Sequence, residues 1–270
     1  MKPPIPSHLL DIEPYLPGKP ADQVERELGV KDAVKMASNE NALGPSPRAL
    51  EAIMEAGGDI HRYPDGPASA LAAKLAATLS VDPAQVILGN GSNEIIELVA
   101  RVFAGPDTEV VMCEHAFLVY ALVTKGVGAM TVKVPARDYH HDLEAMAAAV
   151  GPATRVVFLA NPNNPTGTVF SESQWRSFLD RVPEDVVVVV DEAYREYVED
   201  PQYPDTVGDL DDHPGLLVIR TFSKIYGLAG LRIGYGLGSR HLVSGLQRLR
   251  QPFNVGSLAQ VAAMAALDDC

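Results

Sequence analysis

The sequence predicts an α/β protein with a mainly parallel, doubly wound sheet and helices on both faces. After the first 34 residues, short apolar runs alternate with amphipathic helical patterns, and this alternation is typical of such sheets. The five valines at 186–190 form an unbroken apolar run, as expected for a central strand that is buried on both faces. Hydrophobic residues make up 47% of the 270 residues, which is enough to form a full core.

Each element follows from its local pattern. Residues 1–34 contain six prolines and are expected to form an extended arm, with a short helix over 21–29. Strands are expected at 85–90, 109–114, 130–135, 155–161, 186–192 and 216–222. Helices are expected at 46–56, 67–79, 92–103, 143–150 and 171–182, with another starting near Gly256. The helix at 171–182 opens with a capping-box pattern, Ser171 followed by Gln174.

Composition limits the classes of partner. The formal charge of −13 argues against nucleic acid or an anionic membrane surface as the main partner. The two cysteines, Cys113 and Cys270, indicate neither a disulfide framework nor a metal site. The N-terminus lacks the apolar stretch of a signal peptide, and no apolar run is long enough to span a bilayer. We therefore expect a cytoplasmic protein without membrane contact.

Polar residues follow several of the expected strands, where ligands collect in folds of this kind. The turn Asn90–Glu94 leads directly into a helix that Ser92 or Asn93 could cap, and its free backbone N–H groups could face an anion. The turn at 161–167, NPNNPTG, carries Asn164. Taken alone, these two features describe an ordinary capped helix and a β-turn.

The next two strand ends carry ionisable groups. Asp191 follows the five-valine strand, where a carboxylate is costly unless it is paired, and a protonated ring nitrogen would be a suitable partner. The stretch TFSKIYGLAGLRIGY (221–235) carries hydroxyls, the amine of Lys224 and the guanidinium of Arg232. Desolvation readily lowers the pKa of a lysine, and a guanidinium suits a phosphate. A lysine, an acid and phosphate donors together match pyridoxal phosphate.

In this order, the motifs GNGSNE, NPNNPTG, DEAY and TFSKIYGLAGLRIGY resemble those of the class I/II aminotransferases of PLP fold type I. Three further stretches, IEPYLPGKP (12–20), KMASNENALGPSP (35–47) and HRYPDG (61–66), resemble the histidinol-phosphate aminotransferases. The resemblance runs from about residue 7 to the end.

The resemblance implies a role for each residue at the cofactor. Lys224 resembles the Schiff-base lysine that also moves the substrate proton, and Asp191 resembles the partner of the ring nitrogen. Tyr194 and Asn164 resemble the pair that hydrogen-bonds the ring oxygen. The group that we call the phosphate cradle consists of Ser92, Asn93, Arg232 and either Thr221 or Ser223. No metal is implied.

Further implied roles concern the rim of the site. Phe117 resembles the aromatic residue that stacks on the cofactor ring. Tyr63 resembles the tyrosine that reaches the phosphate in the partner subunit, which implies a homodimer. Tyr15, Asn41 and Asn164 are expected at the substrate.

The implied reaction is transamination between histidinol phosphate and 2-oxoglutarate, written as imidazole acetol phosphate plus glutamate in the direction of histidine biosynthesis. The implied domains are an arm at 1–34, a PLP-binding large domain at 35–250, and at 251–270 the start of a segment leading to a small domain that the sequence lacks. In the family this small domain supplies an arginine for the substrate carboxylate. We expect the cofactor site to be complete and the carboxylate site to lack that arginine. Only transamination at a normal rate would require another cation, Arg220 or Arg240, to take its place.

Three alternatives remain open. An aromatic amino-acid aminotransferase would share the cofactor residues and would accept phenylalanine as amino donor. A PLP-dependent decarboxylase of a phosphorylated amino acid would release CO₂. A non-catalytic phosphate-binding α/β domain would show no absorbance change with pyridoxal phosphate.

Overall fold

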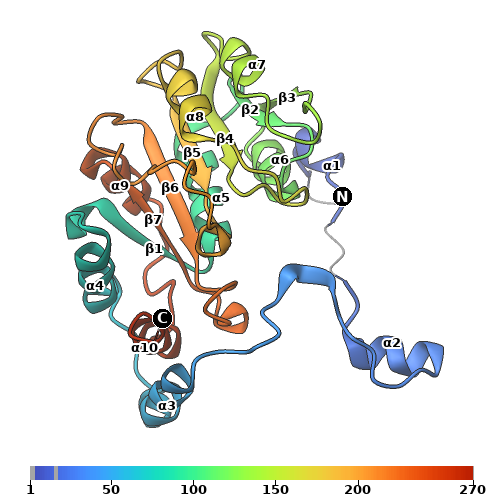
Figure 1. The fold of residues 1–270 in the computed structure, drawn as a ribbon, viewed down its shortest axis with the longest axis vertical. Coiled ribbons are helices and arrows are strands. Elements are labelled where there is room, and N and C mark those ends of the chain that lie inside the picture. Colours follow the sequence, from blue (N-terminus) through green and yellow to red (C-terminus); the bar gives the residue numbers. More distant parts are fainter. Residues whose placement is uncertain (1–3, 15–17, 270) are drawn as a thin grey trace.

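The structure, a computed structural model, describes residues 4–14 and 18–269. These residues contain one seven-stranded sheet with the order β1-β7-β6-β5-β4-β2-β3 (Figure 1). The strands are β1 (Val86–Gly89), β2 (Glu109–Cys113), β3 (Met130–Val134), β4 (Thr154–Ala160), β5 (Val187–Asp191), β6 (Leu216–Thr221) and β7 (Gly234–Gly238). The sheet is mainly parallel, as predicted, because only the two pairings made by β7 are antiparallel.

Helices cover both faces of the sheet (Figure 1). In chain order they are α1 (Ser7–Leu10), α2 (Ala21–Leu28), α3 (Pro47–Ala56), α4 (Ser69–Leu79), α5 (Ser92–Phe103), α6 (Leu118–Gly126), α7 (Leu143–Ala148), α8 (Glu172–Leu179), α9 (Arg240–Gln247) and α10 (Ser257–Ala266). One apolar core joins the sheet to α4, α7, α8 and α10, and a second joins its opposite face to α5, α6 and α9. Within the described residues, no helix has the length and apolar character needed to cross a membrane.

The pattern-based elements are largely confirmed. All six expected strands are present, and the five-valine run forms the centre of the sheet, with every residue of β5 buried. Ser171 and Gln174 form the predicted capping box at α8. Four of the labelled helices and strands were missed: α1, α6, β7 and α9. The strand β7 reads Gly-Tyr-Gly-Leu-Gly, and its glycines conceal it because glycine is disfavoured in strands.

The two ends of the chain pack differently. Helix α2 projects away from the sheet, and Gly29 ends it in the left-handed conformation (Figure 1). Helix α10 begins at Ser257, as expected, and packs against α3 and α4. The domain limits at residues 34 and 250 stay predictions.

The pairing register brings several chain segments to one edge of the sheet. Ala160 on β4 is level with Asp191 on β5, and Asp191 is level with Ile219 on β6. Gly234, the first residue of β7, lies between Thr221, the last residue of β6, and Gly89, the last residue of β1. The predicted motifs therefore converge at this edge.

Candidate active site

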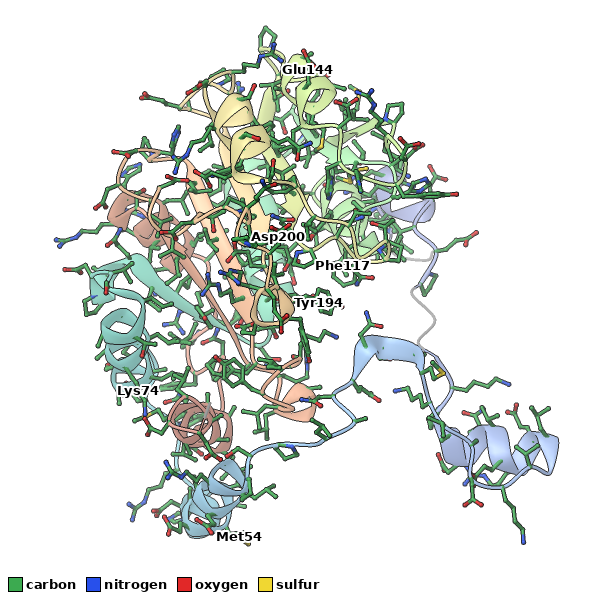
Figure 2. All side chains as sticks on the ribbon, viewed as in Figure 1. Met54, Lys74, Phe117, Glu144, Tyr194 and Asp200 are labelled. Carbon is green, nitrogen blue, oxygen red and sulfur yellow. The ribbon has the colours of Figure 1, made fainter. Side chains whose placement is uncertain are left out.

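A cavity of about 910 Å³ opens at the carboxyl ends of the parallel strands, and we call it the cofactor pocket. Ten of the residues predicted at the cofactor line it: Ser92, Asn93, Phe117, Asn164, Asp191, Tyr194, Thr221, Ser223, Lys224 and Arg232. Phe117 and Tyr194 lie at this edge of the sheet in Figure 2. A neighbouring cavity of about 450 Å³ shares Asn39, Asn164 and Tyr194 with the cofactor pocket, so the space continues beyond it.

Asp191 is a buried carboxylate held by neutral donors. Tyr120 Oη donates to its Oδ2 at 2.8 Å, and the backbone N–H of Ala193 donates to its Oδ1 at 3.1 Å. Burial raises the pKa of Asp191 from 3.8 to about 6, and the Tyr120 hydrogen bond offsets part of that rise. A carboxylate in this position would gain most from a cationic ligand such as a protonated ring nitrogen.

Lys224 enters the same pocket from the turn after β6. Its Nζ donates to the carbonyl of Ser38 at 2.9 Å and lies 5.6 Å from the centre of the Tyr194 ring. Burial lowers the pKa of the Lys224 amine, and the charge of Arg232 lowers it further while Glu40 opposes the change. A larger fraction of the amine is therefore neutral, as a nucleophile or base requires.

Tyr194 and Asn164 line both the cofactor pocket and the neighbouring cavity. Asn39 Nδ2 donates to Tyr194 Oη at 2.8 Å, which leaves the hydroxyl proton of Tyr194 available for an oxygen of a ligand. Burial raises the pKa of Tyr194, so that hydroxyl keeps its proton. The Asn164 amide makes no hydrogen bond to the residues described by the structure and can serve a ligand.

The phosphate cradle is built at two glycines. A Cβ on Gly91 would lie 2.4 Å from Arg232 Nη2, and a Cβ on Gly234 would lie 2.6 Å from the backbone nitrogen of Ser92. Only residues without a side chain let the guanidinium and the first turn of α5 approach so closely. Arg232 itself has a φ of 54°, and its Nη1 donates to the carbonyl of Ala229 at 3.0 Å. A guanidinium and the N-terminal turn of α5, both of which bind anions, thus lie next to each other in the pocket lining.

Two details of the cradle differ from the sequence-based expectation or refine it. Gly91, rather than Ser92 or Asn93, is the N-cap of α5, because the helix begins at Ser92. The Ser92 and Asn93 side chains are therefore free to line the pocket. Thr221 Oγ1 donates to Ser223 Oγ at 2.9 Å. The hydroxyl proton of Thr221 is therefore engaged, and the hydroxyl proton of Ser223 can be donated to a ligand.

Two of the described residues that we predicted at the site, Asn41 and Tyr63, are not in the pocket lining. Asn41 supports its own loop, since its Nδ2 donates to the carbonyl of Ile225 at 2.8 Å and its Oδ1 accepts from the N–H of Leu43. Tyr63 is 83% exposed, and its ring stacks on Phe253 at a centroid distance of 4.7 Å. Tyr15 lies outside the described residues.

Both arginines named as possible replacements for the carboxylate arginine are held in ion pairs. Arg220 Nη2 forms an ion pair of 2.8 Å with Glu192, whose side chain is fully buried. Arg240 forms a surface ion pair of 2.7 Å with Asp82. A buried pair such as Arg220–Glu192 is costly to separate, so Arg220 stays with its partner.

Sequence reasoning missed three residues of the pocket that form hydrogen bonds with predicted site residues: Tyr120, Ser38 and Asn39. Tyr120 lies three residues after Phe117 on the unpredicted helix α6, so the one-turn spacing was the available signal. Ser38 and Asn39 have φ values of 74° and 50°. Such values are uncommon outside glycine. They turn the Ser38 carbonyl and the Asn39 amide toward Lys224 and Tyr194, so Asn39 takes the pocket position that we expected for Asn41.

Comparison with known sequences identifies the family. The class I and II aminotransferase family matches residues 31–270. Histidinol-phosphate aminotransferase 2 of Pseudomonas aeruginosa is 56% identical over 260 residues, which cover 96% of this chain and 70% of that protein. A histidinol-phosphate aminotransferase of Caldicellulosiruptor saccharolyticus is 48% identical over 258 residues, covering 96% of this chain and 72% of that protein.

A solved structure agrees with the sequence comparison. The histidinol-phosphate aminotransferase of Sinorhizobium meliloti, crystallised in complex with pyridoxal 5′-phosphate, superposes with a TM-score of 0.89. Its sequence is 33% identical, and the match covers 98% of this chain and 71% of that one. The sheet order, the pocket at the strand ends and these matches lead to one conclusion: the chain belongs to the class I and II aminotransferases.

Proposed function

We propose that this protein is a pyridoxal phosphate-dependent aminotransferase of the cytoplasm that exchanges an amino group between histidinol phosphate and 2-oxoglutarate, in histidine biosynthesis. The observation that carries the proposal is the meeting of Lys224, Asp191 and the phosphate cradle in one pocket. The substrate is proposed because relatives at 48–56% identity are named histidinol-phosphate aminotransferases.

The residues present fit the cofactor. Arg232 and the first turn of α5 line the cavity next to each other, and Asp191 lacks a hydrogen-bonded cation. Arg232, the N–H groups at the start of α5 and the Ser223 hydroxyl would bind the phosphate. Tyr194 and Asn164 would bind the ring oxygen, and Asp191 would hold a proton on the ring nitrogen.

When bound, pyridoxal phosphate supplies an aldehyde for an amine and a ring that accepts electron density from the substrate Cα. Lys224 Nζ would hold the aldehyde carbon until substrate arrives and would then move the proton between the substrate and the cofactor. A lowered pKa suits this task, because the amine must be neutral when it accepts a proton. The negative charge of Asp191 would stabilise the protonated ring nitrogen.

The first prediction concerns Lys224. Borohydride reduction of the protein mixed with pyridoxal phosphate should attach the cofactor to a single peptide, the one that contains Lys224. Lys224→Ala should abolish this label. The control is Lys35→Ala, which removes the lysine paired with Glu40 near the pocket and should leave the label intact. Mass spectrometry of the digest decides, and a label on another lysine would overturn the assignment.

The second prediction uses the raised pKa of Asp191. Between pH 4 and pH 6 the folded protein binds this proton more tightly than the unfolded chain does, so the free protein loses stability as pH rises through 6. Asp191→Asn removes that loss. The free variant should be more stable than the parent by up to about 3 kcal/mol above pH 6 and should differ little below pH 4. Urea unfolding at several pH values measures this.

The same variant should lose at least about 100-fold in transamination, because an amide cannot stabilise a protonated ring nitrogen. The matched control is Asp185→Asn, an exposed carboxylate just before β5, which should change neither stability nor rate. Normal turnover by Asp191→Asn would refute the proposed role.

The third prediction concerns Tyr63, which we propose reaches the partner's phosphate in a homodimer. Its high exposure supports this proposal. Tyr63→Phe should weaken pyridoxal phosphate binding about tenfold, the effect of one hydrogen bond to a charged group. Tyr139→Phe, at another exposed tyrosine, should not.

Mixed dimers separate the two possible arrangements. In a dimer of one Tyr63→Phe subunit and one Lys224→Ala subunit, a tyrosine acting across the interface leaves one wild-type site, which binds tightly. A tyrosine acting within its own subunit leaves none. A monomer that binds the cofactor tightly would rule out the proposal.

The fourth prediction tests the substrate. The cofactor-loaded protein is mixed separately with histidinol phosphate, histidinol and phenylalanine, and conversion to pyridoxamine phosphate is followed by chromatography in a single turnover. Histidinol phosphate should react at least about tenfold faster than the other two. Phenylalanine reacting as fast would favour the aromatic alternative, CO₂ release from a phosphorylated amino acid would favour the decarboxylase, and no conversion by any donor would favour the non-catalytic domain.

A further inference from the structure

The turn between β1 and α5 leads into Ser92 and Asn93 of the phosphate cradle. Contacts within the turn are not the only ones that hold it in place. Gly91 at its centre has a φ of 75° and lies against the Arg232 guanidinium. As the N-cap of α5, Gly91 has no side chain with which to cap the helix. Something else must therefore fix the position of the Ser92 and Asn93 N–H groups.

The side chain of Asn254, from the loop between α9 and α10, supplies these contacts. Its Nδ2 donates to the carbonyl of Leu88 at 3.1 Å and to Oε2 of Glu94 at 2.6 Å. Its backbone carbonyl accepts from Asn90 Nδ2 at 3.0 Å. Glu94 Oε2 also accepts from the backbone N–H of Asn90, so Asn254 binds both ends of the turn and the carboxylate that closes it.

Asn254 is itself held in one orientation. Arg250 Nη1 donates to its Oδ1 and, at 2.9 Å, to the carbonyl of Gly66. With Oδ1 committed to Arg250, the amide must present its Nδ2 to the turn. Asn254 is half-buried and does not line the cofactor pocket.

We infer that Asn254 is a positioning residue of the phosphate cradle, which acts on the phosphate through the β1–α5 turn. This inference rests on the proposed function. The turn offers backbone N–H groups to an anion, and such groups bind well only when they are already oriented before the ligand arrives. Loss of the Asn254 amide would free the turn and weaken binding of the phosphate, while binding of the ring would be unaffected.

The test compares two ligands that differ only in the phosphate: pyridoxal phosphate and pyridoxal. Asn254→Ala should lower the affinity for pyridoxal phosphate about tenfold and change that for pyridoxal less than about twofold. Asn254→Asp keeps the size of the side chain and the acceptor for Arg250, but it places a second carboxylate next to Glu94. This variant should lose at least as much affinity for pyridoxal phosphate as Asn254→Ala. Gln85→Ala, at the opposite end of β1, is the control and should change neither affinity.

Absorbance titration gives both affinities, and thermal melting verifies that the variants fold. An unchanged preference for pyridoxal phosphate in both Asn254 variants, or an equal loss for both ligands, would overturn the inference. A parent protein without a preference for pyridoxal phosphate would instead refute the proposed cradle itself.

Discussion

The antiparallel course of β7 decides where the cationic half of the site lies. Because β7 runs against its neighbours, its first residue, Gly234, stands beside the last residues of β1 and β6. Arg232, two residues earlier, therefore arrives at the edge where the parallel strands end. A parallel strand in this place would carry Arg232 to the opposite edge, far from Lys224. The small residues of β7 then let the β1–α5 turn approach the guanidinium, so topology and residue size act together.

Asp191 and Lys224 respond to one environment in the pocket. Burial raises the pKa of Asp191 and lowers that of Lys224, so each is moved toward its neutral form. A free protein with such groups is less stable than one with apolar residues in their place. A ligand that brings a cationic ring and an anionic phosphate offsets both penalties together. The pocket therefore suits a ligand that carries a positive charge at the end facing Asp191 and a negative charge at the end facing the phosphate cradle.

Much of this site follows from the sequence because it lies where parallel strands end. Asp191, Lys224 and Asn164 could be placed by periodicity and by the rule that ligands gather at that edge. Tyr120 could not, since it belongs to a helix whose even hydrophobicity conceals its pattern. Asn39 could not either, because its place depends on two left-handed residues in a loop, and local sequence does not determine how such a loop meets Tyr194.

Glu192 follows Asp191 directly, and its contacts explain how two adjacent acids can coexist at the centre of the sheet. Side chains of adjacent residues on a strand point to opposite faces, so Glu192 points away from the pocket. There Arg220 neutralises it, and hydroxyls of Thr206 and Tyr203 donate to its Oε1. The charge of Glu192 still contributes to the raised pKa of Asp191, although burial is the larger cause. The network also commits Arg220 to the fold, so the only cations that line the pocket among the described residues are Lys224 and Arg232. A net charge of −13 therefore coexists with a pocket that attracts an anion.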